Sequence, residues 1–239
     1  ARTTLSKGAS IYTNTPVTQI KKINNKWELI SNEGKIKAKK VIICTNAYSD
    51  MIGNNALWQE LSSSIVPVYS FQVATEPIHD DLKKTILPSC HTVSNTRRLM
   101  LYYSYDHQNR FIMGGRGNAR DKTNIESYRH LINKVSELFP SLINHKIEYY
   151  WSGKVAITTD GMPHIHNPAK GIYAGIGLNG RGVAMGTLLG KWLANAAMEK
   201  MPEDAIPFTK IQPIPFHRWH SVGVNIATKF KYLQDKLGI

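Results

Sequence analysis

Glycine is concentrated in one stretch of the chain, where a short β-prone run is followed by a helical pattern. Seven glycines lie between Gly171 and Leu193. Gly171–Gly175 favours a strand, Gly175–Gly182 a loop with four glycines, and Val183–Met198 a helix. Glycine lets a ligand approach the backbone, and a helix N-terminus offers unpaired N–H groups and a positive dipole end. The segment therefore predicts either a site for an electronegative ligand or a tight loop that packs a helix onto a sheet.

A second segment also ends a strand in small and polar residues. Val41–Ile43 is a continuous apolar run, typical of a strand covered on both faces. Ligands of α/β sheets bind beyond the carboxyl ends of strands, so Thr45 and Asn46 are candidates to line a cofactor crevice. The competing interpretation, which residue preference favours, is that one of them caps a following helix.

The rest of the chain predicts an α+β protein. Residues 9–46 indicate a short parallel strand at Ala9–Tyr12, an antiparallel meander, and a long strand over Lys35–Cys44. Between residues 61 and 155, strands accompany an amphipathic helix over Ile125–Phe139, which Pro140 ends. This pattern predicts an antiparallel sheet with helices on one face, inserted into the first domain. The predicted divisions are 1–60 and 156–200 for the first domain, 61–155 for the insertion, and 201–239 for a C-terminal extended segment and helix.

Composition narrows the function without identifying it. The formal net charge is +13, yet the lysines are scattered and no recognised nucleic-acid module accompanies them, so a nucleic-acid partner is not predicted. No apolar run is long enough to span a bilayer. The spacing of the two cysteines predicts neither a disulfide framework nor a metal site, which fits a reducing, cytoplasmic location.

Three segments, taken in order, resemble the D-amino-acid oxidase (DAO) family of flavoproteins: Val41–Ser49, Trp151–Ile165 and Gly175–Val183. The resemblance runs from about residue 9 to the C-terminus and looks closest to the gamma-glutamylputrescine oxidase-like branch, where Val66–Pro77 and Met113–Gly117 are familiar. It implies a Rossmann-like, glutathione-reductase-type FAD-binding domain and an antiparallel substrate domain. It also implies non-covalent FAD, an amine substrate and molecular oxygen as partners.

The resemblance carries specific residues onto this sequence. It implies that Val17 meets the adenine and that a small-residue turn lies near the pyrophosphate. It further implies that a turn at 160–163 shapes the flavin pocket and that the glycine loop lies beside the isoalloxazine. The predicted cofactor residues are Val17, Thr45, Asn46, Ala47, Asp160, Gly161, Gly177, Leu178, Asn179, Gly180, Arg181, Gly182 and Val183.

The sequence also departs from the family pattern. The family's Gly-x-Gly-x-x-Gly fingerprint is expected before residue 1, so the predicted FAD-binding domain is incomplete and the segment carrying the fingerprint is an expected partner. The chain alone is accordingly expected to bind FAD weakly or not at all. Lys154 stands where several members carry an arginine that holds the substrate carboxylate, which weakens the case for a simple α-amino acid.

The implied reaction is hydride transfer from the carbon beside an amine to flavin N5, followed by imine hydrolysis and peroxide formation. Tyr103, Arg116 and Arg181 are candidates for the catalytic region, and Tyr103, Arg116 and Lys154 for substrate contacts. Strand alternation predicts that Tyr103 and Tyr105 share one face and Tyr102 the other. Two alternatives remain: a membrane-associated amino-acid dehydrogenase of the same fold, and an inactive fragment or binding module.

Overall fold

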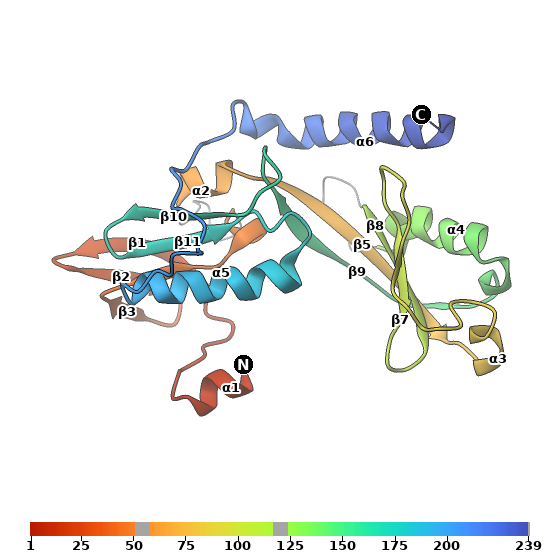
Figure 1. Ribbon diagram of the computed structural model, residues 1–239, viewed down its shortest axis with the longest axis horizontal. Helices are drawn as coiled ribbons and strands as arrows, with labels where there is room; N and C mark the ends of the chain where they lie inside the picture. The colour runs from red at the N-terminus through yellow and green to blue at the C-terminus, as the bar shows by residue number, and fades with distance from the viewer. Residues whose placement is uncertain (51–57, 117–123, 239) are drawn as a thin grey trace. The chain divides into compact units, whose positions relative to one another are not determined.

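The computed structural model describes residues 1–50, 58–116 and 124–238, and the chain divides into two compact units (Figure 1). The first unit comprises Ala1–Ile65 and Thr158–Ile214, and the second comprises Val66–Ile157 and Pro215–Ile239. The predicted C-terminal segment, 201–239, is divided between them. Its extended part joins the first unit, where the Ile214 N–H donates to the Ser63 carbonyl at 2.9 Å.

The first unit holds two small sheets and a long helix. The meander has the order β1-β2-β3, and the second sheet has the order β10-β11-β4. Within the second sheet, β11 runs parallel to β4 and antiparallel to β10. The elements are α1 (Arg2–Ser6), β1 (Val17–Ile23), β2 (Lys26–Ser31), β3 (Lys35–Ala38), β4 (Val41–Ile43), the 3-10 helix η1 (Asn46–Tyr48), α2 (Gln59–Ser63), β10 (His164–Ala169), β11 (Ile172–Ile176) and α5 (Gly182–Ala197).

Two strand predictions in this unit are wrong. Ala9–Tyr12 is exposed and forms no strand. Lys35–Cys44 is not one long strand, because β3 completes the meander whereas β4 leaves it to pair with β11. The change occurs at Lys39–Lys40, and the Val41 N–H then donates to the Gly171 carbonyl at 2.8 Å.

The second unit is built on one antiparallel sheet of order β6-β7-β8-β5-β9. The predicted amphipathic helix covers one face, although its first four residues form a 3-10 turn, and Pro140 begins another such turn after it. The elements are β5 (Val66–Pro77), α3 (Asp80–Lys83), β6 (Val93–Ser94), β7 (Tyr102–Tyr105), β8 (Arg110–Arg116), η2 (Ile125–Tyr128), α4 (Arg129–Leu138), η3 (Pro140–Leu142), β9 (Ile147–Ile157), η4 (His217–Trp219) and α6 (His220–Leu237).

The C-terminal helix α6 is tied to the second unit by one carboxylate. Asp235 accepts the backbone N–H groups of Arg98 at 2.8 Å and Leu99 at 2.9 Å. These two bonds hold the last turns of α6 against the segment that leads into β7. Among the described helices, none combines the length and the apolarity that a bilayer crossing requires.

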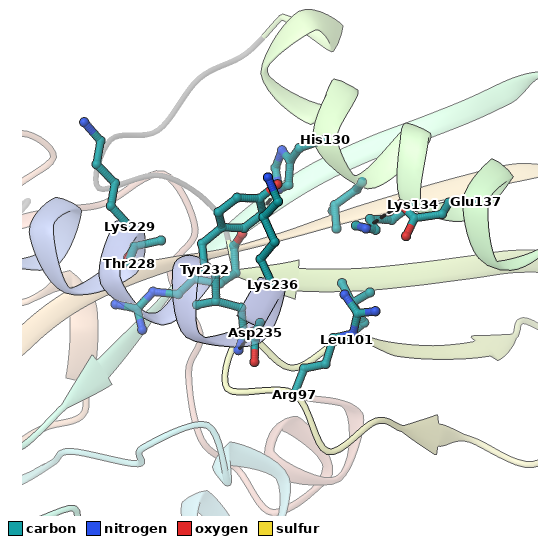
Figure 2. A pocket seen from close by; sticks show the side chains of 13 residues that line it. Arg97, Leu101, His130, Lys134, Glu137, Thr228, Lys229, Tyr232, Asp235 and Lys236 are labelled. Atoms are coloured by element: carbon teal, nitrogen blue, oxygen red, sulfur yellow. Dashed lines mark hydrogen bonds and ion pairs between the residues drawn. The ribbon is translucent and has the colours of Figure 1, made fainter. Parts of the chain in front are cut away.

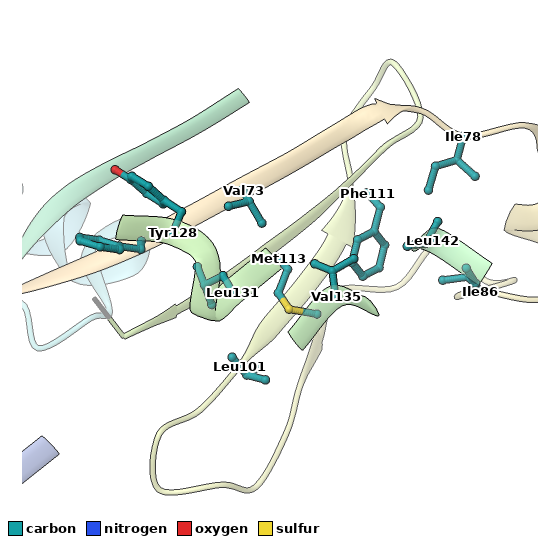
Figure 3. Packing of buried hydrophobic residues seen from close by; sticks show 11 residues of the cluster. Val73, Ile78, Ile86, Leu101, Phe111, Met113, Tyr128, Leu131, Val135 and Leu142 are labelled. Carbon is teal, nitrogen blue, oxygen red and sulfur yellow. The ribbon is translucent and has the colours of Figure 1, made fainter. Parts of the chain in front are cut away.

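The core of the second unit lies between α4 and one face of its sheet (Figure 3). Phe111 and Met113 from β8 and Phe71 from β5 are fully buried there and meet Leu131 and Val135 of α4. The spacing of the apolar residues on α4, one to each turn, produces this contact. The main core of the first unit forms where α5 packs on β11, through Tyr173, Leu189, Trp192 and Leu193.

Truncating a core aromatic should unfold the second unit more readily. Phe111→Ala should lower the free energy of unfolding by about 3–5 kcal/mol, because it removes a fully buried ring and leaves a cavity. Phe216→Ala, at a side chain 82 % exposed, is the control and should change it by less than about 0.5 kcal/mol. Urea denaturation followed by circular dichroism measures both. Equal effects of the two substitutions would contradict this description of the core.

Candidate cofactor site

The end of β4 and the start of the glycine loop are joined by a single side chain. The Asn46 Oδ1 atom accepts the backbone N–H of Gly177 at 3.0 Å. Asn46 has a φ of 45°, in the left-handed region that asparagine tolerates better than most residues, and Gly177 has a φ of 78°. The two segments predicted to share a cofactor site therefore meet in the first unit.

Capping, the interpretation that residue preference favoured for this segment, is wrong. The 3-10 helix η1 has no side-chain cap, and the Thr45 hydroxyl lies 2.8 Å from the Ser49 hydroxyl. Asn46 reaches across to the glycine loop instead. Ala47, the middle residue of η1, is buried.

Asn179 joins the glycine loop to a third segment, the turn at 158–162. Its Oδ1 atom accepts the Thr158 N–H at 3.0 Å, and its Nδ2 donates to the Gly177 carbonyl at 2.5 Å and to the Thr158 hydroxyl at 3.1 Å. The Thr158 hydroxyl in turn donates to the Met162 carbonyl at 2.9 Å. Residues 46, 158–162 and 177–179 are thus one hydrogen-bonded network.

Asp160 gives this turn a fixed negative charge. Its carboxylate accepts the Met162 backbone N–H at 3.1 Å, and a carboxylate oxygen lies 3.2 Å from His164 Nε2. The bond from Met162 is the largest cause that lowers the pKa of Asp160 from 3.8 to about 2, and the bond to His164 adds to it. The Arg181 guanidinium lies 3.5 Å from the Gly161 carbonyl, so this turn also orients the arginine.

The N-terminus of α5 is open. The helix begins at Gly182 with no side-chain cap and no acidic residue in its first turn. Val183 is 94 % exposed, and a Cβ added at Gly180, where φ is 82°, would meet nothing within 4 Å. A helix of 16 residues therefore presents unpaired N–H groups and a positive dipole end beside the network.

These observations fit the edge of a flavin ring. Such a ring has an electronegative edge, and the open helix end and Arg181 offer a positive charge with room beside Gly180. Two other predicted cofactor residues take no part in the hydrogen-bonded network through their side chains. Val17 begins β1, and Leu178 packs against the core beneath α5. Their predicted contacts with the cofactor stay predictions.

The substrate candidates belong to the second unit and do not lie together. The Tyr103 ring packs against Phe111 at 5.9 Å and Phe139 at 5.3 Å between centroids, on the face that α4 covers. Lys154 lies over the Tyr69 ring at 5.8 Å, and Tyr69 packs against the same core. Packing accounts for the position of Tyr103, and its contact with substrate gains no support from this placement.

The opposite face of this sheet has a different character. Tyr102 lies there, as strand alternation predicted, and its hydroxyl is hydrogen-bonded to the Ser70 hydroxyl. The Tyr102 ring fills the space over Gly114, where an added Cβ would lie 2.0 Å from a ring carbon. Gln72 of β5 pairs with Gly114 of β8 on one side and with Trp151 of β9 on the other. Trp151 is 40 % exposed. This half-exposed face carries hydroxyl, amide and aromatic groups.

Arg116 ends β8 and lines a cavity within the second unit. Its Nε atom is buried and has no hydrogen-bond partner among the described residues. Burial lowers the pKa of its guanidinium. The adjacent Gly117, part of the same predicted turn, lies outside the described residues.

Sequence reasoning missed three of these side chains. Thr158 and Ser70 lie in segments whose sequence has no catalytic signature, and Tyr102 was distinguished from Tyr103 only by its face. Glycines were the available signal, because Gly114 and Gly177 are where a neighbouring side chain approaches the backbone closely. His164 and His166 stack at 5.9 Å, and no group of metal-binding residues occurs in the described ranges.

The fold and this site define a class of protein, the flavin-dependent oxidoreductases. The family described as FAD dependent oxidoreductase (DAO) matches residues 1–196, and the chain belongs to it. It is 28 % identical to a probable oxidoreductase, OrdL, of Haemophilus influenzae over 83 % of this chain and 45 % of that protein. It is 27 % identical to the gamma-glutamylputrescine oxidoreductase of Escherichia coli over 97 % of this chain and 54 % of that protein.

Solved structures agree on the fold. Glycine oxidase from Geobacillus kaustophilus has a TM-score of 0.68 at 22 % identity, with 88 % of this chain and 55 % of that chain covered. Iminodiacetate oxidase from Chelativorans sp. BNC1 has a TM-score of 0.67 at 18 % identity, over 89 % and 56 %. The α+β fold and the FAD-dependent class are therefore confirmed. The chain spans about half the length of the curated relatives that it matches.

Removing the Asn46 acceptor should release the glycine loop. Asn46→Gly keeps the left-handed backbone accessible but deletes the bond to Gly177, whereas Asn46→Asp keeps an acceptor. We expect Asn46→Gly to raise the amide hydrogen-exchange rate of Gly177 about fivefold, as the loss of roughly 1 kcal/mol implies, and Asn46→Asp to change it little. Asn24→Gly, at another left-handed asparagine in the β1–β2 turn, is the matched control. Unchanged exchange in Asn46→Gly would refute the proposed tether.

The Asp160 carboxylate should titrate well below an ordinary aspartate. Because its folded-state pKa is depressed to about 2 from 3.8, its contribution to stability is complete above pH 3.8 and is lost as the pH falls toward 2. Asp160→Asn should remove this part of the acid dependence. Since the side chain is 51 % exposed, the effect on total stability is small, and the direct measurement is a carbon-13 NMR titration of the carboxyl group. A midpoint at 3.8 or higher would disprove the assignment.

Proposed function

We propose that the protein is an FAD-dependent oxidoreductase that oxidises a small amine or amino-acid-like compound, with non-covalent FAD and molecular oxygen as the electron acceptor. The observation that carries the proposal is the network in the first unit, where Asn46, Asn179 and the turn at 158–162 hold the glycine loop beside the open end of α5. That arrangement has the charge and the space that the electronegative edge of a flavin needs. A segment carrying the phosphate-binding fingerprint remains the proposed partner of this site.

The flavin supplies the acceptor for a hydride taken from the carbon beside the amine. The chain's own residues supply orientation and charge. The N–H groups in the first turn of α5 and the Arg181 guanidinium would hold the electronegative edge of a bound flavin and would stabilise negative charge there. Asn46 and Asn179 act by holding the loop still, since a displaced loop would misdirect those donors.

We place the substrate contacts in the second unit, on the sheet face that α4 does not cover. The paired hydroxyls of Ser70 and Tyr102, together with Gln72 and Trp151, offer hydrogen bonds and an aromatic wall to a small polar amine. Three similar proteins are named for glycine, iminodiacetate and gamma-glutamylputrescine. Each of these compounds contains an amine group, which supports this substrate class.

The proposed cellular location is the cytoplasm. Cys44 and Cys90 are both free thiols and both exposed. Unpaired exposed thiols are typical of proteins that work in a reducing compartment.

Filling the opening beside Gly180 should weaken FAD binding. Gly180→Ala adds a methyl group where the loop is open and also strains a backbone with φ of 82° by about 1 kcal/mol. Gly8→Ala imposes the same strain at φ 83°, also in open space, and serves as the control. We expect Gly180→Ala to raise the Kd for FAD about tenfold or more, and Gly8→Ala to leave it unchanged, measured by quenching of flavin fluorescence in the protein reconstituted with FAD.

The activity test uses the reconstituted protein and a panel of primary and secondary amines. Anaerobic bleaching of the flavin by an amine, followed by peroxide release on admission of air, is the expected outcome. If an amine bleaches the flavin but air produces no peroxide, the electron acceptor is a compound other than oxygen, as in a dehydrogenase. A protein that takes up no FAD even when the segment carrying the phosphate-binding fingerprint is supplied would refute the proposal.

A further inference from the structure

A cavity of about 540 Å³ lies wholly within the second unit, bounded by α4, the segment that precedes β7, and α6 (Figure 2). A volume of this size accommodates a small organic molecule. The cavity is separate from the network around Asn46, which belongs to the first unit. The charges, the buried arginine and the apolar lining of this cavity indicate what it binds.

Positive charge dominates the lining. Arg97, Arg116, Lys134, Lys229 and Lys236 face two carboxylates, Glu137 and Asp235, a formal excess of three positive charges. Both carboxylates are already engaged. Glu137 pairs with Lys134, and Asp235 accepts two backbone N–H groups. Within the described part of the chain, no ion pair engages the remaining four cations. Arg97 also lies close enough to Glu137 and Asp235 to lower the pKa of both carboxyl groups, and the lining as a whole keeps an excess of positive charge.

Among these four cations, Arg116 gives the strongest evidence for a bound anion. Its Nε atom is buried and unpartnered among the described residues, and burial lowers the pKa of the guanidinium. Taking a cation out of water without a counter-ion is unfavourable, and a bound anion with a hydrogen-bond acceptor would relieve this cost. His130 lies at the same end, with its Nε2 atom 3.3 Å from the Arg116 carbonyl.

Apart from His130 and Thr228, the remaining lining is apolar and aromatic. Leu99, Leu101 and Leu131 contribute side chains, and the Tyr232 ring lies on the α6 side of the cavity among the labelled cations (Figure 2). An inorganic ion would leave this surface without a partner. A ligand with an apolar body and an anionic group satisfies both parts of the lining.

We infer that this cavity binds a small organic anion, with a phosphate or carboxylate group at Arg116, Lys229 and Lys236 and an apolar or aromatic body against Leu101, Leu131 and Tyr232. The site is additional to the flavin and amine sites of the proposed function and does not depend on them. Helix α6 supplies one wall, so occupancy should also fix α6 against the segment that Asp235 already holds.

Phenyl phosphate and phenylacetate are suitable probes for the two anionic groups, and inorganic phosphate and phenol are the matched half-ligands. Isothermal titration calorimetry on the full chain at low ionic strength should give binding of at least one aromatic anion at least tenfold tighter than either half-ligand. The tighter binder of the two aromatic anions then shows whether the cavity prefers a phosphate or a carboxylate group. Equal affinity for the aromatic anion and for its inorganic half, or no binding of either aromatic anion, would overturn the proposal.

Two variants and a control locate the site. Arg116→Gln and the double change Lys229→Gln with Lys236→Gln should each weaken binding of the preferred aromatic anion about tenfold or more. Lys231→Gln removes the same charge from α6 outside this lining and should leave affinity unchanged. If Lys231→Gln weakened binding as much as the lysine double variant, the anion would be attracted by the general positive charge of α6. The cavity would then not be the binding site. The lysines are exposed, so their replacement leaves the fold intact, as circular dichroism should verify.

Discussion

The glycine loop depends on side-chain hydrogen bonds that tie it to other segments of the first unit. Gly177 and Gly180 both adopt left-handed backbone angles, and such a loop has no regular hydrogen-bond ladder of its own. Asn46 satisfies one of its backbone donors, and Asn179 satisfies one of its carbonyls while fixing it to Thr158. Because these bonds come from three separate segments of the first unit, the position of the α5 N-terminus depends on the packing of all three. A cofactor site there is preorganised to the degree that this network is intact.

Local patterns in the sequence predicted the long elements well. The helical spacing of apolar residues located α4, the glycine loop preceded the predicted helix that is α5, and the turn signals located the meander. The split of Lys35–Cys44 was not predictable from these patterns, because β-prone residues continue through the point where the chain changes sheets. Only the pairing of β4 with β11, a contact between residues distant in sequence, determines that change.

The candidate site shows the same limit at single residues. Helix-capping preference describes only neighbours in sequence, whereas the partner of Asn46 lies 131 residues away. The resemblance to a family located Asn46, Asn179 and Asp160 but not the hydrogen bonds that connect them. Strand alternation placed Tyr102 and Tyr103 on opposite faces correctly, yet it could not say which face α4 covers. That choice depends on tertiary packing, and it separates a core tyrosine from one that a ligand can reach.

The net charge of the chain gains a physical meaning from the cavity beside α6. A charge of +13 spread over separate exposed lysines interacts weakly with any one partner, because water and salt screen each charge. Around Arg116 the same kind of charge is gathered at a cavity, one nitrogen is buried, and the available carboxylates are committed elsewhere. Desolvation strengthens the attraction of such a group for an anion, whereas dispersal on a surface weakens it. The feature that predicts anion binding is therefore the local excess of positive charge around one half-buried arginine. Composition alone could not locate that residue.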